Sequence, residues 1–169
     1  RHVQVYKRGK ASADVEFGLQ LFLAESRQGF IVNFDLRKDR PQNDCKFIKP
    51  CIESLEKAGI SINSFAGDRG FDSQRTEQYL DDTKIKSHIF PKNVCNLREK
   101  LQDEAFLDAT KRRSQTESRI GILKNNFLGG ILKAKGYNNQ LLCVSWAILT
   151  HNLWILARMP MKEAPQILA

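Results

Sequence analysis

The pattern of apolar and polar positions predicts one amphipathic helix over Thr110–Gly130, and the rest of the chain is organised around it. At about 100° per residue, four side chains fall on one apolar stripe. These side chains are Thr116, Ile120, Leu123 and Phe127. Such a stripe is typical of a helix that packs one face against a core.

Elsewhere, short runs rich in β-branched and aromatic residues predict strands. Val15–Ala24 and Phe30–Asp35 predict an antiparallel hairpin, and Ile60–Ala66 and Lys84–Phe90 predict two later strands. Side chains of alternating character in the first run favour a strand with two distinct faces. We therefore expect four strands, with the hairpin first.

Helical spacing predicts three further segments. Asp44–Ala58 has apolar residues at helical spacing and is followed by a glycine, and Ser73–Asp82 begins at a serine that suits an N-cap. Gln140–Arg158 is apolar on nearly every side, so it is expected either between layers or in an interface. Lys92–Ala109 is polar and reads as loop or weak helix. The order predicts an α/β fold, a mixed sheet flanked by helices.

The last predicted helix raises the question of a membrane. Its apolar core, Leu141–Ala157, is short for a span and carries His151 and Asn152. We interpret it as a buried core helix, and we expect no membrane partner.

The net charge and its distribution say more about the partner of this chain than the overall composition does. The 169 residues are 41% hydrophobic, which indicates a folded domain, and 27 basic against 19 acidic residues give a net charge of +8. Between Lys111 and Gly136 there are seven cations and one acid, a local net charge of +6. This excess favours a nucleic-acid partner, although a solvated basic surface is the alternative reading.

Cysteine and histidine usage argues against a zinc site. Cys45, Cys51, Cys95 and Cys143 show no C-x2-C spacing, and the chain has three histidines that are not paired. Buried free thiols in a reducing compartment are the simplest interpretation.

Two acids are candidates for chemistry. Asp68 follows a predicted strand directly, where ligands collect in α/β folds, although an Asp-x-Gly sequence is also ordinary turn material. On the helical wheel Glu117 lies with Arg113 and Lys124 within roughly 40°, although Glu117 and Arg113 could simply form an i, i+4 ion pair. Together, a strand-end Asp and a helix Glu flanked by cations suit a divalent metal that acts on a phosphodiester.

These residues carry a resemblance. GDRGFDS at Gly67–Ser73, the spacing of Arg113, Glu117 and Lys124, and KRGKASADVEFGLQ at Lys7–Gln20 resemble bacterial insertion-sequence transposases of the DDE class. The family signature has a tyrosine where this chain has Thr110. The resemblance implies an RNase H-like fold for the catalytic domain.

The resemblance also implies a first catalytic Asp on a first strand, and no residue here fits that position. Asp14 precedes a strand that reads as the second, and Asp35 ends the third. We therefore expect residues 1–169 to be a single domain, truncated at its N-terminus, that lacks the first strand and its Asp. Such a fragment alone would lack the complete triad.

In the intact protein, the resemblance implies Mg²⁺ or Mn²⁺ held by Asp68 and Glu117, with in-line phosphoryl transfer that cleaves and joins DNA. Residues expected to contact the DNA backbone are Arg113 and Lys124, and more weakly Arg119, Lys133 and Lys135.

The expected partners are double-stranded transposon-end and target DNA and a second copy of the protein in the active complex. The expected location is the bacterial cytoplasm, at the nucleoid when bound to DNA. Three alternatives remain open: a metal-dependent nuclease of the same fold, a catalytically dead DNA-binding transposase remnant, and a basic α/β domain without a nucleic-acid role.

Overall fold

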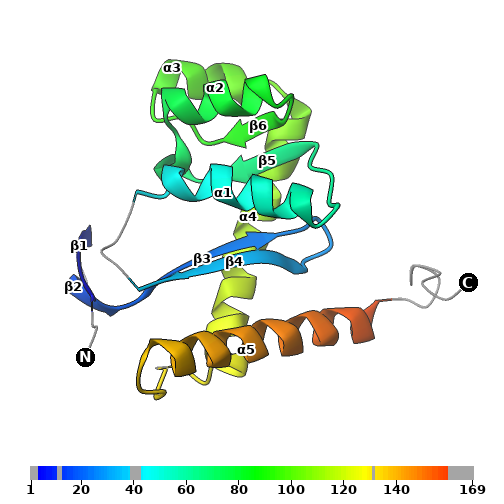
Figure 1. Ribbon diagram of the computed structural model, residues 1–169. Helices are drawn as coiled ribbons and strands as arrows, with labels where there is room; N and C mark the ends of the chain where they lie inside the picture. Colours follow the sequence, from blue (N-terminus) through cyan, green and yellow to red (C-terminus); the bar gives the residue numbers. More distant parts are fainter. Residues whose placement is uncertain (1–3, 11–12, 39–42, 131, 160–169) are drawn as a thin grey trace, which may run out of the picture.

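The computed structural model describes residues 4–10, 13–38, 43–130 and 132–159 (Figure 1). Their strands form three two-stranded ladders. The antiparallel pairs are β1 (Gln4–Lys10) with β2 (Ala13–Gly18) and β3 (Gln20–Glu25) with β4 (Ile31–Arg37), and the parallel pair is β5 (Ser64–Gly67) with β6 (Lys86–Ile89).

Helices occupy most of the remaining described chain. They are α1 (Cys45–Lys57), the 3₁₀ turn η1 (Arg69–Phe71), α2 (Gln74–Asp82), α3 (Val94–Lys100), α4 (Glu104–Ile122), the π turn η2 (Leu123–Phe127) and α5 (Tyr137–Arg158). The predicted fold class is confirmed: the chain is a mixed α/β fold with small sheets flanked by helices.

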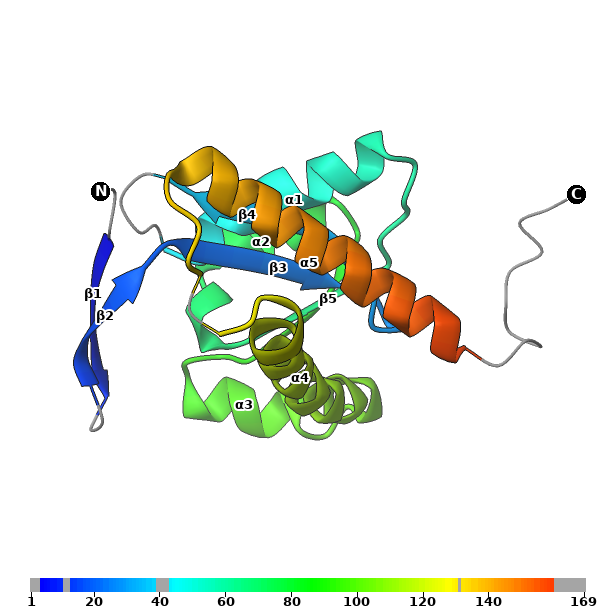
Figure 2. The same cartoon turned by 90° about the horizontal axis from the view of Figure 1, so that it is seen from below.

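The β3–β4 hairpin is a middle layer with a helix on each face, α1 on one side and α5 on the other (Figures 1 and 2). Alternation along β3 produces this arrangement, because neighbouring side chains point to opposite faces. Leu21 and Leu23 pack towards α5, whereas Phe22 is buried against Phe47 of α1, with ring centroids 5.0 Å apart.

Helix α1 also covers the β5–β6 pair. Ile48 and Ile52 lie in a core with Leu80 of α2 and Ile89 of β6. Cys51, on the side of α1 that faces β3–β4, is buried, and this burial raises the pKa of its thiol to about 11. It is therefore a protonated core residue at neutral pH.

Several predicted boundaries are confirmed. Helices are found at α1 and α2, and the Ser73 hydroxyl accepts a hydrogen bond from Thr76 N at 3.2 Å as the expected N-cap. Gly59, beyond α1, has φ of 76°, which glycine adopts without strain. The stripe on the central helix also faces inwards, with Leu123 almost fully buried.

Several details of the prediction are wrong. Helix α4 begins at Glu104, six residues before Thr110, and the thiols of Cys95 and Cys143 are exposed and not buried. The run Val15–Ala24 is two strands, because it pairs with β1 up to Gly18 and with β4 from Gln20 onwards. Strand β1 itself was not expected. The segment Lys92–Ala109 is mostly helical, because the Asn93 and Asp103 side chains cap α3 and the start of α4.

Helix α5 is buried along one face only. Val144, Ala147, Ile148 and His151 pack towards the hairpin, and the opposite face is exposed. Its apolar character is therefore not explained by burial between layers. It is long and apolar enough to cross a membrane by length and composition, with 22% of its most apolar stretch buried in the fold.

One polar residue joins α5 to the hairpin. The Asn152 side chain makes two hydrogen bonds to the backbone of Ile31. Its Nδ2 donates to Ile31 O, and its Oδ1 accepts from Ile31 N, each at a donor–acceptor distance of 2.9 Å. This pairing satisfies both backbone groups of Ile31, the first residue of β4, against the core.

We predict that Asn152→Ala lowers the free energy of unfolding by about 1–3 kcal/mol, because it leaves both Ile31 backbone groups without this partner. Urea unfolding followed by circular dichroism measures this loss. Asn138→Ala, in the exposed first turn of α5, is the control and should change stability by less than about 0.5 kcal/mol. Equal effects of the two substitutions would contradict the assignment.

Candidate active site

Asp68 is the first residue after β5 and is exposed. Its carboxylate accepts a hydrogen bond from Gly70 N at 2.8 Å and caps the turn η1. The turn is tight: a Cβ at Gly70 would lie 2.5 Å from Asp44 Oδ2 and 2.9 Å from Asp68 Oδ1. A side chain at Gly70 would therefore push both carboxylates away from their places.

Asp44 is a neighbour that sequence reasoning did not identify. It precedes α1, and its Oδ1 accepts a hydrogen bond from Gln20 Nε2 at 3.4 Å. No spacing pattern connects Asp44 with Asp68, since the fold alone brings the start of α1 beside the end of β5.

Phe90 lies beside Asp68 at the same edge of the parallel pair. Gly67 pairs with Ile89, and Phe90 N donates to Gly67 O at 3.1 Å. Asp68 and Phe90 therefore follow the ends of adjacent strands, whose separation is about 4.8 Å.

The side chain of Arg113, on α4, lies over the ring of Phe90. The Arg113 guanidinium carbon lies 4.8 Å from the ring centroid, and its Nη2 lies 3.6 Å from Glu117 Oε1. The Glu117 side chain is 68% exposed. A continuous set of neighbours thus runs from Asp68 through Phe90 and Arg113 to Glu117, and α4 packs against both β5 and β6.

The i, i+4 ion pair between Arg113 and Glu117 is present, as the simpler reading of the sequence expected. It does not exclude a role in chemistry, because both side chains are at the surface where a DNA strand could reach them. An exposed pair of this kind contributes only about 0.3–0.5 kcal/mol to stability.

Asp68 and Glu117 are carboxylates, which are the hard oxygen donors that Mg²⁺ and Mn²⁺ prefer. Within the described parts of the chain, no three His, Cys, Asp or Glu side chains lie close enough together to hold a metal ion. Two carboxylates still fit Mg²⁺, which commonly uses one or two of them together with water and substrate phosphate oxygens.

The predicted DNA-contacting lysines are exposed. Lys124 lies on the π turn η2, immediately after α4, and Lys133 and Lys135 lie in the segment that leads to α5. The turn η2 packs on α4 and α5.

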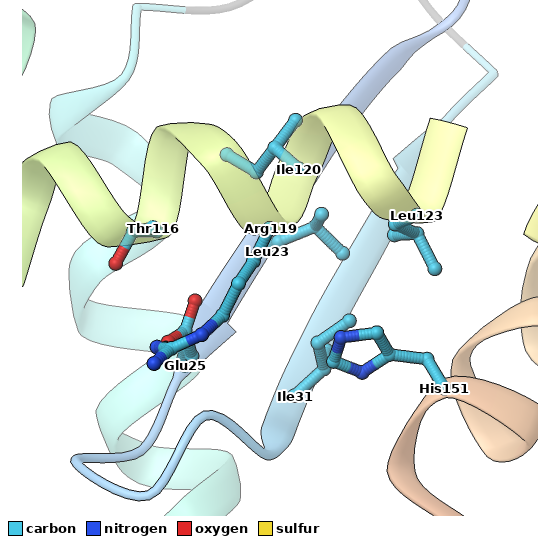
Figure 3. Close-up of a pocket in the computed structure, with 8 residues that line it drawn as sticks. All are labelled: Leu23, Glu25, Ile31, Thr116, Arg119, Ile120, Leu123 and His151. Carbon is cyan, nitrogen blue, oxygen red and sulfur yellow. The ribbon is translucent and has the colours of Figure 1, made fainter. Parts of the chain in front are cut away.

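Arg119 differs from the other predicted cations. Its guanidinium pairs with Glu25 at the end of β3 and also approaches Gly29 of the hairpin turn (Figure 3). The two side chains are 28% and 11% exposed. Arg119 therefore attaches α4 to the hairpin, and contact with a DNA backbone would require it to leave Glu25.

A small cavity lies beside this ion pair, between α4, the hairpin and α5 (Figure 3). Its volume is about 10 Å³, with Leu23, Ile31, Ile120 and His151 in its wall. Organic ligands occupy about 300–1,000 Å³, so this space holds no more than a water molecule. The candidate active site is the open surface at Asp68 and Glu117.

Phe90 is the second neighbour, after Asp44, that sequence reasoning missed. The sequence pattern places Phe90 at the apolar end of a predicted strand. The one signal that could have revealed its role is that it is an aromatic residue at the end of the strand next to the strand that Asp68 follows. Thr110 occupies the position where the family has tyrosine, and its hydroxyl donates to Phe106 O at 2.9 Å. The aromatic ring beside Arg113 thus comes from Phe90, the residue that follows β6.

We predict a favourable coupling between Phe90 and Arg113 of about 0.5–1 kcal/mol, because the guanidinium lies over the ring. A double-mutant cycle with Phe90→Leu and Arg113→Met, measured by urea unfolding, gives this value. The matched control is a second cycle that combines Phe90→Leu with Arg112→Met, because the Arg112 side chain pairs with Asp108. Coupling of equal size in both cycles would rule out the specific contact.

A family model described as "Transposase DDE domain" matches residues 2–153. Searches of curated proteins and of solved structures returned no match.

Proposed function

The chain belongs to the transposase DDE domain family, and from this premise we propose that it cleaves transposon-end DNA and transfers the strand by metal-dependent in-line phosphoryl transfer. Membership implies a transposase that acts on DNA and, as is general in such enzymes, uses divalent metal ions. The observation that supports the finer proposal is the series of neighbours that links Asp68 through Phe90 and Arg113 to Glu117.

Asp68 and Glu117 are proposed to hold Mg²⁺ or Mn²⁺. When bound, the ion supplies Lewis-acid stabilisation of the transferred phosphoryl oxygens. The two carboxylates come from different elements, a strand end and a helix, so the packing of α4 on β5 and β6 sets their relative position. The hydrogen bond from Gly70 N fixes one Asp68 oxygen and leaves the carboxylate at the surface.

Arg113 is proposed to bind the DNA phosphate nearest the metal site. Phe90 holds its guanidinium from one side while Glu117 lies on another, so its orientation is limited before DNA arrives. Lys124 is proposed to contact the backbone further along, with weaker contributions from Lys133 and Lys135. Arg119 contributes least, because its partner Glu25 already neutralises it.

We further propose that residues 1–169 form a single domain, that the active complex is a homodimer, and that it acts in the bacterial cytoplasm at the nucleoid. In this proposal the protein binds the DNA through its phosphates. Such contacts set the affinity and the register of the complex without recognising the base sequence. The high net positive charge of +8 supports such a partner.

A non-catalytic DNA-binding remnant is the second candidate. It is favoured by one observation: within the described residues, no three His, Cys, Asp or Glu side chains lie close enough together to hold a metal ion. Strand cleavage separates it from an active enzyme, and a strand-transfer assay separates a transposase from a nuclease of the same fold.

We predict that Glu117→Gln and Asp68→Asn each lower cleavage of labelled transposon-end DNA by more than about 10²-fold, since each removes one charged metal ligand. DNA affinity, measured by fluorescence anisotropy, should stay within about threefold. Glu104→Gln, exposed at the start of the same helix, is the control and should leave cleavage unchanged. Normal cleavage by either site variant would disprove its role.

Paramagnetic Mn²⁺ gives a readout that does not need catalysis. Saturable binding followed by water-proton relaxation should weaken in both site variants and persist in Glu104→Gln. Binding that is indifferent to all three substitutions would show that the two carboxylates do not hold the metal.

We predict that Lys124→Ala weakens DNA binding at every sequence and lowers the slope of log affinity against log salt by about one unit, because one phosphate contact is lost. The measurement is anisotropy across a salt series. Lys57→Ala, at the exposed end of α1, is the matched control. An unchanged slope for Lys124→Ala would remove this lysine from the interface.

A further inference from the structure

The carboxyl edge of the parallel pair β5–β6 carries a further cation, Lys92. This exposed residue lies two positions beyond Phe90, in the segment that leads from β6 to α3. Because β5 and β6 run in the same direction, the segments that carry Asp68 and Lys92 leave the sheet at the same edge (Figure 1). Ligands of α/β folds bind outside this edge. Lys92 therefore lies on the side of the molecule where a ligand of Asp68 would bind.

Two hydrogen bonds to Asp72 hold Lys92 in place. The backbone N of Lys92 donates to Asp72 Oδ2 at 2.5 Å, and its Nζ donates to Asp72 O at 2.6 Å. Asp72 directly follows the turn η1, and Asp68 caps the start of the same turn. Lys92 is thus attached to the turn that Asp68 caps, so this one turn sets the positions of both side chains.

The distance between Lys92 and Asp68 suits one DNA strand. Phe90 N donates to Gly67 O, so the residues that follow the two strands stay adjacent. With a strand spacing of about 4.8 Å and about 3.8 Å between successive Cα atoms, the Cα of Lys92 lies within roughly 13 Å of that of Asp68. Since the nucleotides of one strand follow each other at about 3.4 Å along the helix axis, both residues reach the same few nucleotides.

The charge of Lys92 is not neutralised by an ion pair. Its ammonium group donates to a neutral carbonyl, and among the residues that the structure describes no carboxylate forms an ion pair with it. Lys86, at the start of the same strand, differs because it pairs with Asp103. The Asp72 carboxylate accepts from the backbone N of Lys92 instead. Lys92 therefore presents a charged group that is already ordered, which reduces the entropy lost on binding.

We propose that Lys92 is a phosphate-binding residue of the candidate active site, that Asp72 orients it, and that it binds the DNA backbone beside the phosphate held by Arg113. Arg113 lies over the ring of Phe90, two residues before Lys92, so the two cations approach the same stretch of the strand. Contacts of this type fix the register of a strand without reading its bases. The inference rests on the proposed function, because it takes DNA as the partner of this edge.

DNA affinity across a salt series tests the proposal. The probe is a fluorescein-labelled DNA duplex of random sequence, followed by anisotropy, because phosphate contacts do not depend on the bases. Lys92→Gln should weaken binding at least about threefold and lower the slope of log affinity against log salt by about one unit. Lys92→Arg should restore both, since a guanidinium also binds phosphate. An unchanged slope for Lys92→Gln would overturn the proposal.

Lys84→Gln is the matched control. Lys84 is exposed and precedes β6, so it lies at the opposite end of the strand from Lys92. Loss of its charge should leave the slope unchanged. Equal falls in slope for the two variants would reflect net charge alone and overturn the assignment of Lys92.

Asp72→Ala separates orientation from charge. Loss of a negative charge from a DNA-binding surface strengthens binding by itself. If Asp72 orients Lys92, its removal should instead weaken binding about 2–10-fold, which is the affinity that the prior ordering of one side chain contributes. In the Lys92→Gln background the same change should no longer weaken binding. Tighter binding by the single variant would overturn the role of Asp72.

Arg113→Gln, measured in the same series, distinguishes failure of this inference from failure of the proposed function. If Arg113→Gln weakens binding and Lys92→Gln does not, only the inference about Lys92 fails. If the unaltered chain does not bind the duplex, the proposed function fails together with it. Urea unfolding completes the comparison: a Lys92→Gln variant that is less stable but binds DNA with the normal slope would make Lys92 a structural residue and overturn the proposal.

Discussion

The rest of the structure depends on the packing of α1 against two strand pairs at once. Within the described residues, β3–β4 and β5–β6 share no hydrogen-bonded ladder, so backbone pairing does not hold them together. Phe47 and Cys51 of α1 are buried against the hairpin, and Ile48 and Ile52 are buried against the parallel pair. Side-chain packing therefore sets how the two parts of the domain are oriented.

The opposite side of this arrangement is held by α4. This helix packs on β5 and β6, pairs through Arg119 with Glu25 of the hairpin, and continues into η2, which packs on α5. The candidate active site lies along its length. Asp68 and Glu117 belong to two elements, the end of β5 and α4, and the packing of α4 on β5 and β6 sets how these elements are oriented.

Local patterns predicted most of the helices and strands, and long-range pairing explains the errors. Ser73 correctly marked the start of α2 and Gly59 the end of α1, because helix capping depends on a few adjacent residues. The run Val15–Ala24 was read as one strand because its change of partner at Gly18 leaves no trace in an alternating pattern. In the same way, the apolar character of α5 predicted burial or an interface without saying which.

In the candidate site, the sequence predicted the contact between Arg113 and Glu117 but not the neighbours that come from other elements. Spacing on one helix brought Arg113 and Glu117 together, and the structure has that contact. Phe90 and Asp44 come from other elements, so only the fold brings them to the site. Arg119 lies within the same motif, yet its partner Glu25 is on a distant strand, which no local pattern could indicate.

The π turn η2 has a consequence for how this chain tolerates change in length. Leu128 N donates to Leu123 O across five residues, so the turn holds one residue more than an α-helix would. Removing Asn125 or Asn126, both exposed, would take out this extra residue and restore a regular helix, while the segments on either side keep their directions. Phe127 would then keep its contacts with His151 and Trp154. An extra residue in the regular part of α4 would instead rotate everything beyond it by about 100° and move Phe127 away from both rings, so the chain tolerates a deletion in the turn better than an insertion in the helix.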